Sequence, residues 1–226
     1  QGKLSGPVPV SGGQRPLAEI SLNLLDGPGA TLTALPAKDA ELQAKLETLF
    51  PNRDQSYAMA LLDITPGRPL RYVAQQESRS FAPGSVGKLL VMTGLFDQLR
   101  RLYPDDLKAR ARLLRDTQVV ADRFVLPNSH AVPVVSEGLS GVTHRAVEVG
   151  DTFSLWEWVD HMVSPSSNAA GSMVWKQALL LDEFGAAYPP TKVAEDEFFR
   201  RTPKAELSAR SVAILEAPLR RAGLNV

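Results

Sequence analysis

The chain of 226 residues contains no cysteine, and this absence excludes several kinds of chemistry. Disulfide bonds, thiolate metal ligands and a cysteine nucleophile are all ruled out. The three histidines, His130, His144 and His161, are scattered and lack the paired spacing of a zinc site. We therefore expect no dedicated metal site.

The sequence also lacks net charge and long apolar runs. Its 25 Lys and Arg residues balance its 25 Asp and Glu residues, so nothing favours nucleic acid or an anionic membrane as a partner. No apolar stretch reaches the roughly 18 residues that a membrane span needs. The chain begins at Gln1 rather than Met, which we interpret as the start of a mature exported protein, although a trimmed chain would begin in the same way.

The pattern of apolar residues indicates two parts. Residues 1–36 are rich in Gly and Pro and are expected to form an extended arm or linker. Residues 37–226 are expected to form one domain. In this domain, residues 37–50 have the apolar spacing of an amphipathic helix, and "SYAMALLDI", "TPGRP" and "LRYVAQQ" read as a strand, a turn and a second strand of an antiparallel hairpin.

Mostly helices follow the hairpin. They are predicted from about Ser85 to Leu102, over the short segment "DDLKARARLLRD", over "LWEWVDHMV" with Ser154 as N-cap, over "NAAGSMVWKQALLLDEF" with Gly185 as C′ residue, and after Thr202-Pro203 as N-cap and first helical residue. Residues 117–151 are predicted to be a loop region with short strands. The two strands of the hairpin are too few to cover this many apolar helices.

The stretch "FAPGSVGKLL" places Ser85 three residues before Lys88 at the start of a predicted helix. Side chains at positions i and i+3 share a helix face, so a neutral Lys88 amine can reach Ser85 Oγ as its base. The first backbone N–H groups of the helix are able to stabilise an oxyanion. A Ser-x-x-Lys string is expected about once by chance in such a chain, so Ser85 as a plain N-cap and Lys88 as a solvated residue remain the alternative.

A second polar turn, "SPSSN", lies between two predicted helices and contains Ser166, Ser167 and Asn168. A serine hydroxyl at this turn is suited to relay a proton, and an Asn amide to orient the lysine and a substrate carbonyl. The alternative is that Ser166 or Ser167 only caps the next helix.

The two motifs and their helices resemble the penicillin-recognising serine hydrolases, namely class A-like β-lactamases and D-alanyl-D-alanine peptidases. The likeness covers residues 39–185. It implies an α+β fold of the β-lactamase/transpeptidase type, with an antiparallel sheet beside a helical subdomain. It also implies Ser85 as the acylated nucleophile, Lys88 as its base, Ser166 as proton relay and Asn168 as a substrate-orienting group. No cofactor is implied, the substrate would be a β-lactam or a peptidoglycan-type peptide, and the setting would be periplasmic or secreted.

The sequence departs from the family at three points. Ser167 stands where class A lactamases usually carry Asp, and the separation of Ser85 from Ser166 is longer than in compact members. No Lys-Thr-Gly or Lys-Ser-Gly triad is found. We therefore expect the domain to be incomplete at its C-terminus, with further strands supplied downstream or by a second chain, and with apolar helix faces exposed. Glu206 is a candidate for activating the deacylating water, although a surface helix residue is the plainer interpretation.

Two further functional hypotheses stay open. In the first, the chain is a non-catalytic binding module on the same fold. In the second, it is an unrelated helical structural protein in which the residues of each motif only cap helices.

Overall fold

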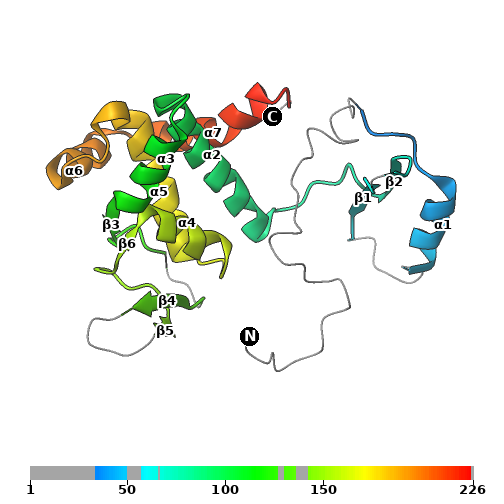
Figure 1. Cartoon of the computed structure of the whole chain (residues 1–226), viewed down its shortest axis with the longest axis horizontal. Coiled ribbons are helices and arrows are strands. Elements are labelled where there is room, and N and C mark those ends of the chain that lie inside the picture. Colours follow the sequence, from blue (N-terminus) through cyan, green and yellow to red (C-terminus); the bar gives the residue numbers. More distant parts are fainter. Residues whose placement is uncertain (1–33, 50–56, 66, 127–129, 136–141, 225–226) are drawn as a thin grey trace. The chain divides into compact units, whose positions relative to one another are not determined.

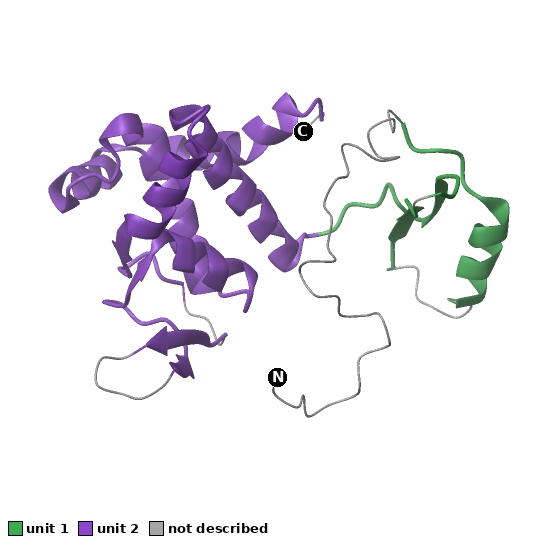
Figure 2. Ribbon diagram, in the orientation of Figure 1, with its two compact units in different colours: residues 1–81 green, residues 82–226 purple. Residues whose placement is uncertain are grey.

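The computed structural model describes residues 34–49, 57–65, 67–126, 130–135 and 142–224. Its contacts divide the chain into two compact units, residues 1–81 and residues 82–226 (Figure 2). The division falls inside the predicted 37–226 domain, and the predicted arm, residues 1–36, lies almost wholly outside the described residues. Within these residues the fold is α+β, with a majority of helix and with three two-stranded antiparallel sheets.

The first unit contains the predicted helix and hairpin. Helix α1 spans Ala40–Leu49, and strands β1 (Met59–Asp63) and β2 (Arg71–Gln75) pair in antiparallel register. Asp39 accepts a hydrogen bond from the Leu42 backbone N–H and pairs with Arg71 on β2 at 2.8 Å. The guanidinium of Arg71 holds the pKa of Asp39 well below its usual range. This one carboxylate therefore caps α1 and ties the helix to the hairpin.

The second unit is a helical bundle with small sheets at its edge (Figure 1). Its elements in chain order are η3 (Gly84–Val86), α2 (Gly87–Leu102), α3 (Leu107–Asp116), β3 (Gln118–Val120), β4 (Val132–Val135), β5 (Val142–Arg145), β6 (Thr152–Ser154), α4 (Leu155–Val163), α5 (Asn168–Phe184), η4 (Gly185–Ala187), α6 (Lys192–Arg201) and α7 (Lys204–Arg221). Strand β3 pairs with β6, and β4 pairs with β5.

Helix α5 is at the centre of the bundle and packs against α2, α4 and α7. Apolar side chains on several of its faces are buried, as expected of a helix enclosed by neighbours. On α2, Leu95 and Leu99 are almost fully buried, as are Trp158 and Met162 on α4. Burial of these side chains supplies the main stabilisation of the unit.

A close approach of α2 and α7 requires Gly94. A Cβ at this position would meet Ile214 Cγ2 at 3.0 Å and its backbone oxygen at 3.1 Å. Glycine thus sets the separation of the two helices, because a side chain would force them apart.

Several cap signals in the sequence are confirmed. Ser154 forms a capping box with Glu157 at the start of α4, and Gly185, with a φ of +48°, ends α5. The prediction of Thr202 as an N-cap is wrong by one residue, because Pro203 is the N-cap of α7. The Thr202 hydroxyl instead donates to the Phe198 carbonyl at the end of α6. Helix α6 itself was not predicted.

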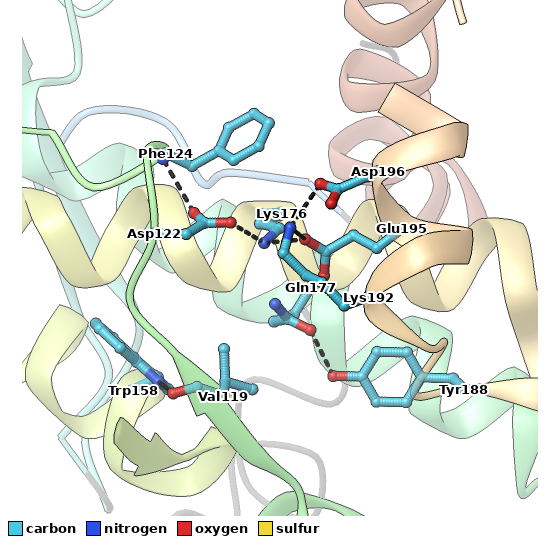
Figure 3. A network of polar contacts seen from close by, with 10 residues as sticks. All are labelled: Val119, Asp122, Phe124, Trp158, Lys176, Gln177, Tyr188, Lys192, Glu195 and Asp196. Atoms are coloured by element: carbon cyan, nitrogen blue, oxygen red, sulfur yellow. Dashed lines mark hydrogen bonds and ion pairs between the residues drawn. The ribbon is translucent and has the colours of Figure 1, made fainter. Parts of the chain in front are cut away.

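An ion cluster joins α5 to α6 and to the segment after β3 (Figure 3). Lys176, only 4% exposed, lies 2.6 Å from Asp122 and 2.8 Å from Glu195. Its amine also lies 5.2 Å from the centre of the Phe124 ring. Two carboxylates and an aromatic face compensate the burial of one cation, so this cluster fixes the segment that follows β3.

Exposed apolar side chains also occur on α2 and in the turn before it. Val86, Leu89 and Phe96 are 66%, 48% and 39% exposed. In the part of the chain that the structure describes, no helix has both the length and the apolar character to cross a bilayer.

Candidate active site

Ser85 lies in the single 3-10 turn η3, which leads directly into α2. Gly84 has a φ of +53°, a conformation that glycine adopts without a steric penalty. The Val86 N–H makes the first bond of the turn, to the Pro83 carbonyl, so the Ser85 N–H precedes the helical hydrogen-bond ladder. The Ser85 side chain is exposed at this end of the bundle.

Lys88 is in the first turn of α2 and is partly buried. Its Nζ atom lies 3.1 Å from Ser85 Oγ, 3.0 Å from Ser166 Oγ and 2.7 Å from Asn168 Oδ1. It also lies 2.9 Å from the Ser166 carbonyl oxygen. All four residues predicted from the sequence to form the site therefore meet around one amine.

The partners of Lys88 differ in what they can donate. Asn168 Oδ1 and the Ser166 carbonyl only accept hydrogen bonds, whereas each serine hydroxyl can also donate. A neutral amine has two N–H groups and one lone pair. In that state the two carbonyl oxygens take both N–H groups, and the lone pair is left for a hydroxyl of Ser85 or Ser166.

The Ser166-Ser167-Asn168 turn separates the roles of its two serines. Ser167 is the N-cap of α5: its Oγ accepts from the Ala170 N–H at 3.2 Å, and its side chain is fully buried. Ser166 does not cap the helix, and its hydroxyl and its carbonyl both contact Lys88. Ser166 also has a φ of +62°, a strained value for a residue with a Cβ and one that concentrates at functional sites.

The C-terminal part of α4 contacts the Ser166-Ser167-Asn168 turn. The Ser167 N–H donates to the His161 carbonyl at 3.0 Å, and the His161 ring packs edge-on against Phe153. This ring is 3% exposed, and neither of its nitrogens has a hydrogen-bond partner among the described residues. Burial lowers the pKa of His161, so the neutral ring is the form that fits the fold.

A pocket of about 420 Å³ opens beside Ser85 and Lys88. Helix α5 contributes Asn168, Gly171, Ser172 and Trp175 to it, which is the i, i+3, i+4, i+7 stripe of one helix face. This periodicity is visible in the sequence, but Gly171, Ser172 and Trp175 belong to no motif that marks them as site residues. The contribution of Leu126 has no comparable local signal.

The other candidate groups lie elsewhere. Glu206 is exposed in the first turn of α7 and is not among the described residues that line the pocket. Its role as a deacylating base stays a prediction. Within the described ranges, no group of three or more His, Asp or Glu side chains is placed to hold a metal ion.

Comparison of the chain with models of protein families, with curated proteins and with solved structures found no match. The likeness to the penicillin-recognising hydrolases therefore rests on the two motifs and the helices around them.

Proposed function

We propose that this protein is a serine hydrolase or acyltransferase that works through a covalent acyl-enzyme on Ser85. The observation that supports this best is the convergence of Ser85 Oγ, Ser166 Oγ and Asn168 Oδ1 within 3.1 Å of Lys88 Nζ. Nucleophile, base and a third orienting group in mutual hydrogen-bond reach are the usual signature of nucleophilic catalysis.

In the proposed acylation, neutral Lys88 accepts the proton of Ser85 as Oγ attacks a carbonyl carbon. The backbone N–H groups at the start of η3 and α2 favour the resulting oxyanion. Ser166 Oγ, 3.0 Å from Lys88 Nζ, then passes the proton to the leaving group. Asn168 holds the amine in place and offers its amide N–H₂ to the substrate.

The finer assignment within this proposal is to the β-lactamase and D,D-peptidase type, with a β-lactam or a peptidoglycan-type peptide as substrate and with a periplasmic or secreted location. This assignment is based on the motif resemblance. The α+β fold is compatible with the assignment. The Ser85–Lys88–Ser166–Asn168 arrangement is the same set of contacts that the resemblance implies.

The test is covalent labelling of the full chain with a fluorescent penicillin and, separately, with a fluorophosphonate, followed by peptide mass spectrometry. We expect an adduct on Ser85 that disappears in Ser85→Ala and persists in Ser208→Ala, which removes an exposed hydroxyl on α7. An adduct from the fluorophosphonate alone would keep the serine hydrolase and reject the β-lactam assignment. No adduct from either probe would reject the proposal and favour a binding module.

A further inference from the structure

The pocket beside Ser85 differs sharply in chemistry between its two parts. In one part, Ser85 Oγ and Asn168 Oδ1 both contact the Lys88 amine. The larger side chains that complete it are Leu90, Val91, Leu126, Trp175 and Leu215. Such a site, mostly apolar with a few convergent polar groups, is the usual form of a small-molecule pocket, and its volume falls in their range of roughly 300–1,000 Å³.

Of the two remaining polar side chains of the lining, Ser172 makes internal hydrogen bonds, and Trp175 has a buried indole nitrogen without a hydrogen-bond partner among the described residues. Ser172 Oγ donates to the Ala169 carbonyl at 2.8 Å and accepts from the Leu126 N–H. The indole nitrogen of Trp175 is shut off from solvent, so the accessible surface of this ring is carbon. Among the described residues that line the pocket, Lys88 is the sole ionisable side chain. A charged group of a ligand that lies away from Lys88 would therefore be buried there without a counter-ion, at a desolvation cost.

We propose that this pocket binds the acyl group of the substrate, and that this group is an uncharged aliphatic chain of medium length. The inference rests on the proposed function. The acyl group stays bonded to Ser85 Oγ after the leaving group departs, so a pocket that contains Ser85 must accommodate it through both half-reactions. Leu126, Leu215 and Trp175 then contact its methylenes.

The proposed reaction with an ester probe has two steps, acylation of Ser85 and hydrolysis of the acyl-enzyme. Ser85 Oγ adds to the ester carbonyl, the bond to the alcohol oxygen breaks, and the Ser85 proton leaves with the alcohol by way of Lys88 and Ser166. Water then cleaves the Ser85 ester, which releases the carboxylic acid and restores the hydroxyl.

The first measurement is catalytic, with the full chain and the p-nitrophenyl esters of acetic, butyric, hexanoic and octanoic acid. We expect kcat/KM to rise roughly three- to fourfold per methylene, as burial of each CH₂ predicts. An ester of equal length that ends in a carboxylate should be hydrolysed at least about tenfold more slowly.

The second measurement avoids catalysis. Ser85→Ala protein is titrated calorimetrically with butanoate, hexanoate and octanoate, whose affinities should increase in that order. Leu126→Asp should weaken octanoate binding by roughly tenfold, because it places a carboxylate in the apolar lining. Leu126 is 57% exposed, so this change spares the core. The matched control is Leu107→Asp, at an equally apolar and 72% exposed position on α3 outside the pocket, and it should have no effect.

The outcomes separate the two proposals. Ser85-dependent hydrolysis with flat chain-length profiles in both measurements overturns the aliphatic acyl pocket and keeps the serine hydrolase. Length-dependent binding of carboxylates without hydrolysis or a Ser85 adduct overturns the serine hydrolase, and the acyl-group inference fails with it. If affinity depends on length but Leu126→Asp leaves it unchanged, the acyl chain binds elsewhere. That outcome overturns the acyl-pocket inference and keeps the proposed function.

Discussion

The backbone of Ser166 is in the left-handed region, with a φ of +62°. Serine pays a steric penalty there that glycine avoids. The conformation is held because the Ser166 carbonyl accepts from Lys88 and the next residue caps α5. Strain at this position is thus tied to the geometry that brings the Ser166 hydroxyl to Lys88.

This arrangement predicts that stability and activity separate at Ser166. In Ser166→Gly we expect the free energy of unfolding to stay level or rise by up to about 1 kcal/mol, because the backbone strain is relieved. The acylation rate should fall by about 100-fold or more, because the proposed proton relay is lost. Urea unfolding and the rate of fluorophosphonate labelling measure the two effects. Ser164→Ala, at the exposed C-cap of α4, should change the labelling rate little, and an unaltered rate in Ser166→Gly would reject the relay.

His161 predicts a dependence of stability on pH. Because burial lowers its pKa below the usual 6.5, the unfolded chain takes up a proton that the folded chain does not. The free energy of unfolding should therefore be constant above about pH 6.5 and fall below it, by about 1 kcal/mol per pH unit. The nearby carboxylates of Asp160 and Glu157 act against this fall by favouring the charged ring.

Urea unfolding between pH 5.5 and 7.5 measures this effect. His161→Phe should abolish the fall, since a phenyl ring fits the apolar contact with Phe153 and does not titrate. The exposed His144 provides the control, and His144→Gln should retain the full pH dependence. A fall that survives His161→Phe would assign it to another group.

At the scale of elements, the Lys176 cluster fastens the segment after β3 and helix α6 to α5 (Figure 3). This segment continues to Leu126, whose backbone N–H contacts Ser172 at 3.4 Å in the lining of the Ser85 pocket. An ion cluster whose members do not line the Ser85 pocket thus supports one wall of the candidate site.

We predict that Lys176→Met lowers the free energy of unfolding by about 3 kcal/mol, because it leaves Asp122 and Glu195 without their buried cation. Lys192 also pairs with Glu195, at 3.2 Å, but its side chain is 64% exposed. The control Lys192→Met should therefore cost less than about 1 kcal/mol. Denaturant unfolding compares the two, and equal losses would contradict a special role for the buried amine.

Element boundaries were predictable where a local signal decides them. The Ser154–Glu157 capping box and the glycine at 185 are such signals, and both are confirmed. Helix α6 escaped prediction because it is mainly charged and only Phe198 is fully buried in it, so its apolar periodicity is weak. Thr202 was assigned to the wrong helix because a threonine between two helices is equally able to end one or begin the other.

At the scale of the whole molecule, the site was predictable only in part. The three-residue spacing from η3 into the first turn of α2 brings Ser85 and Lys88 together, and this local contact is confirmed. The approach of Ser166 and Asn168 depends on the packing of α5 against α2, which helical periodicity does not reveal. The resemblance to a known family supplied that pairing. The apolar pocket remained unpredicted, because Leu126 and Leu215 come from separate segments with no shared motif.

The contact between Lys88 and Asn168 spans 80 residues of chain, and this span has a consequence for folding kinetics. Closing so long a loop follows the formation of individual helices, which takes about a microsecond. A chain with its helices formed but α2 and α5 undocked keeps Lys88 close to Ser85 in sequence but lacks Ser166 and Asn168 around the Lys88 amine.

We therefore predict that reactivity of Ser85 returns later than helical structure during refolding. Pulses of fluorophosphonate at successive refolding times should give label that lags the far-ultraviolet circular dichroism signal and coincides with the return of tryptophan fluorescence. Label that recovers together with the earliest helical signal would contradict this order. If the label instead lags the helical signal, the labelling of Ser85 reports when the two distant helices α2 and α5 dock.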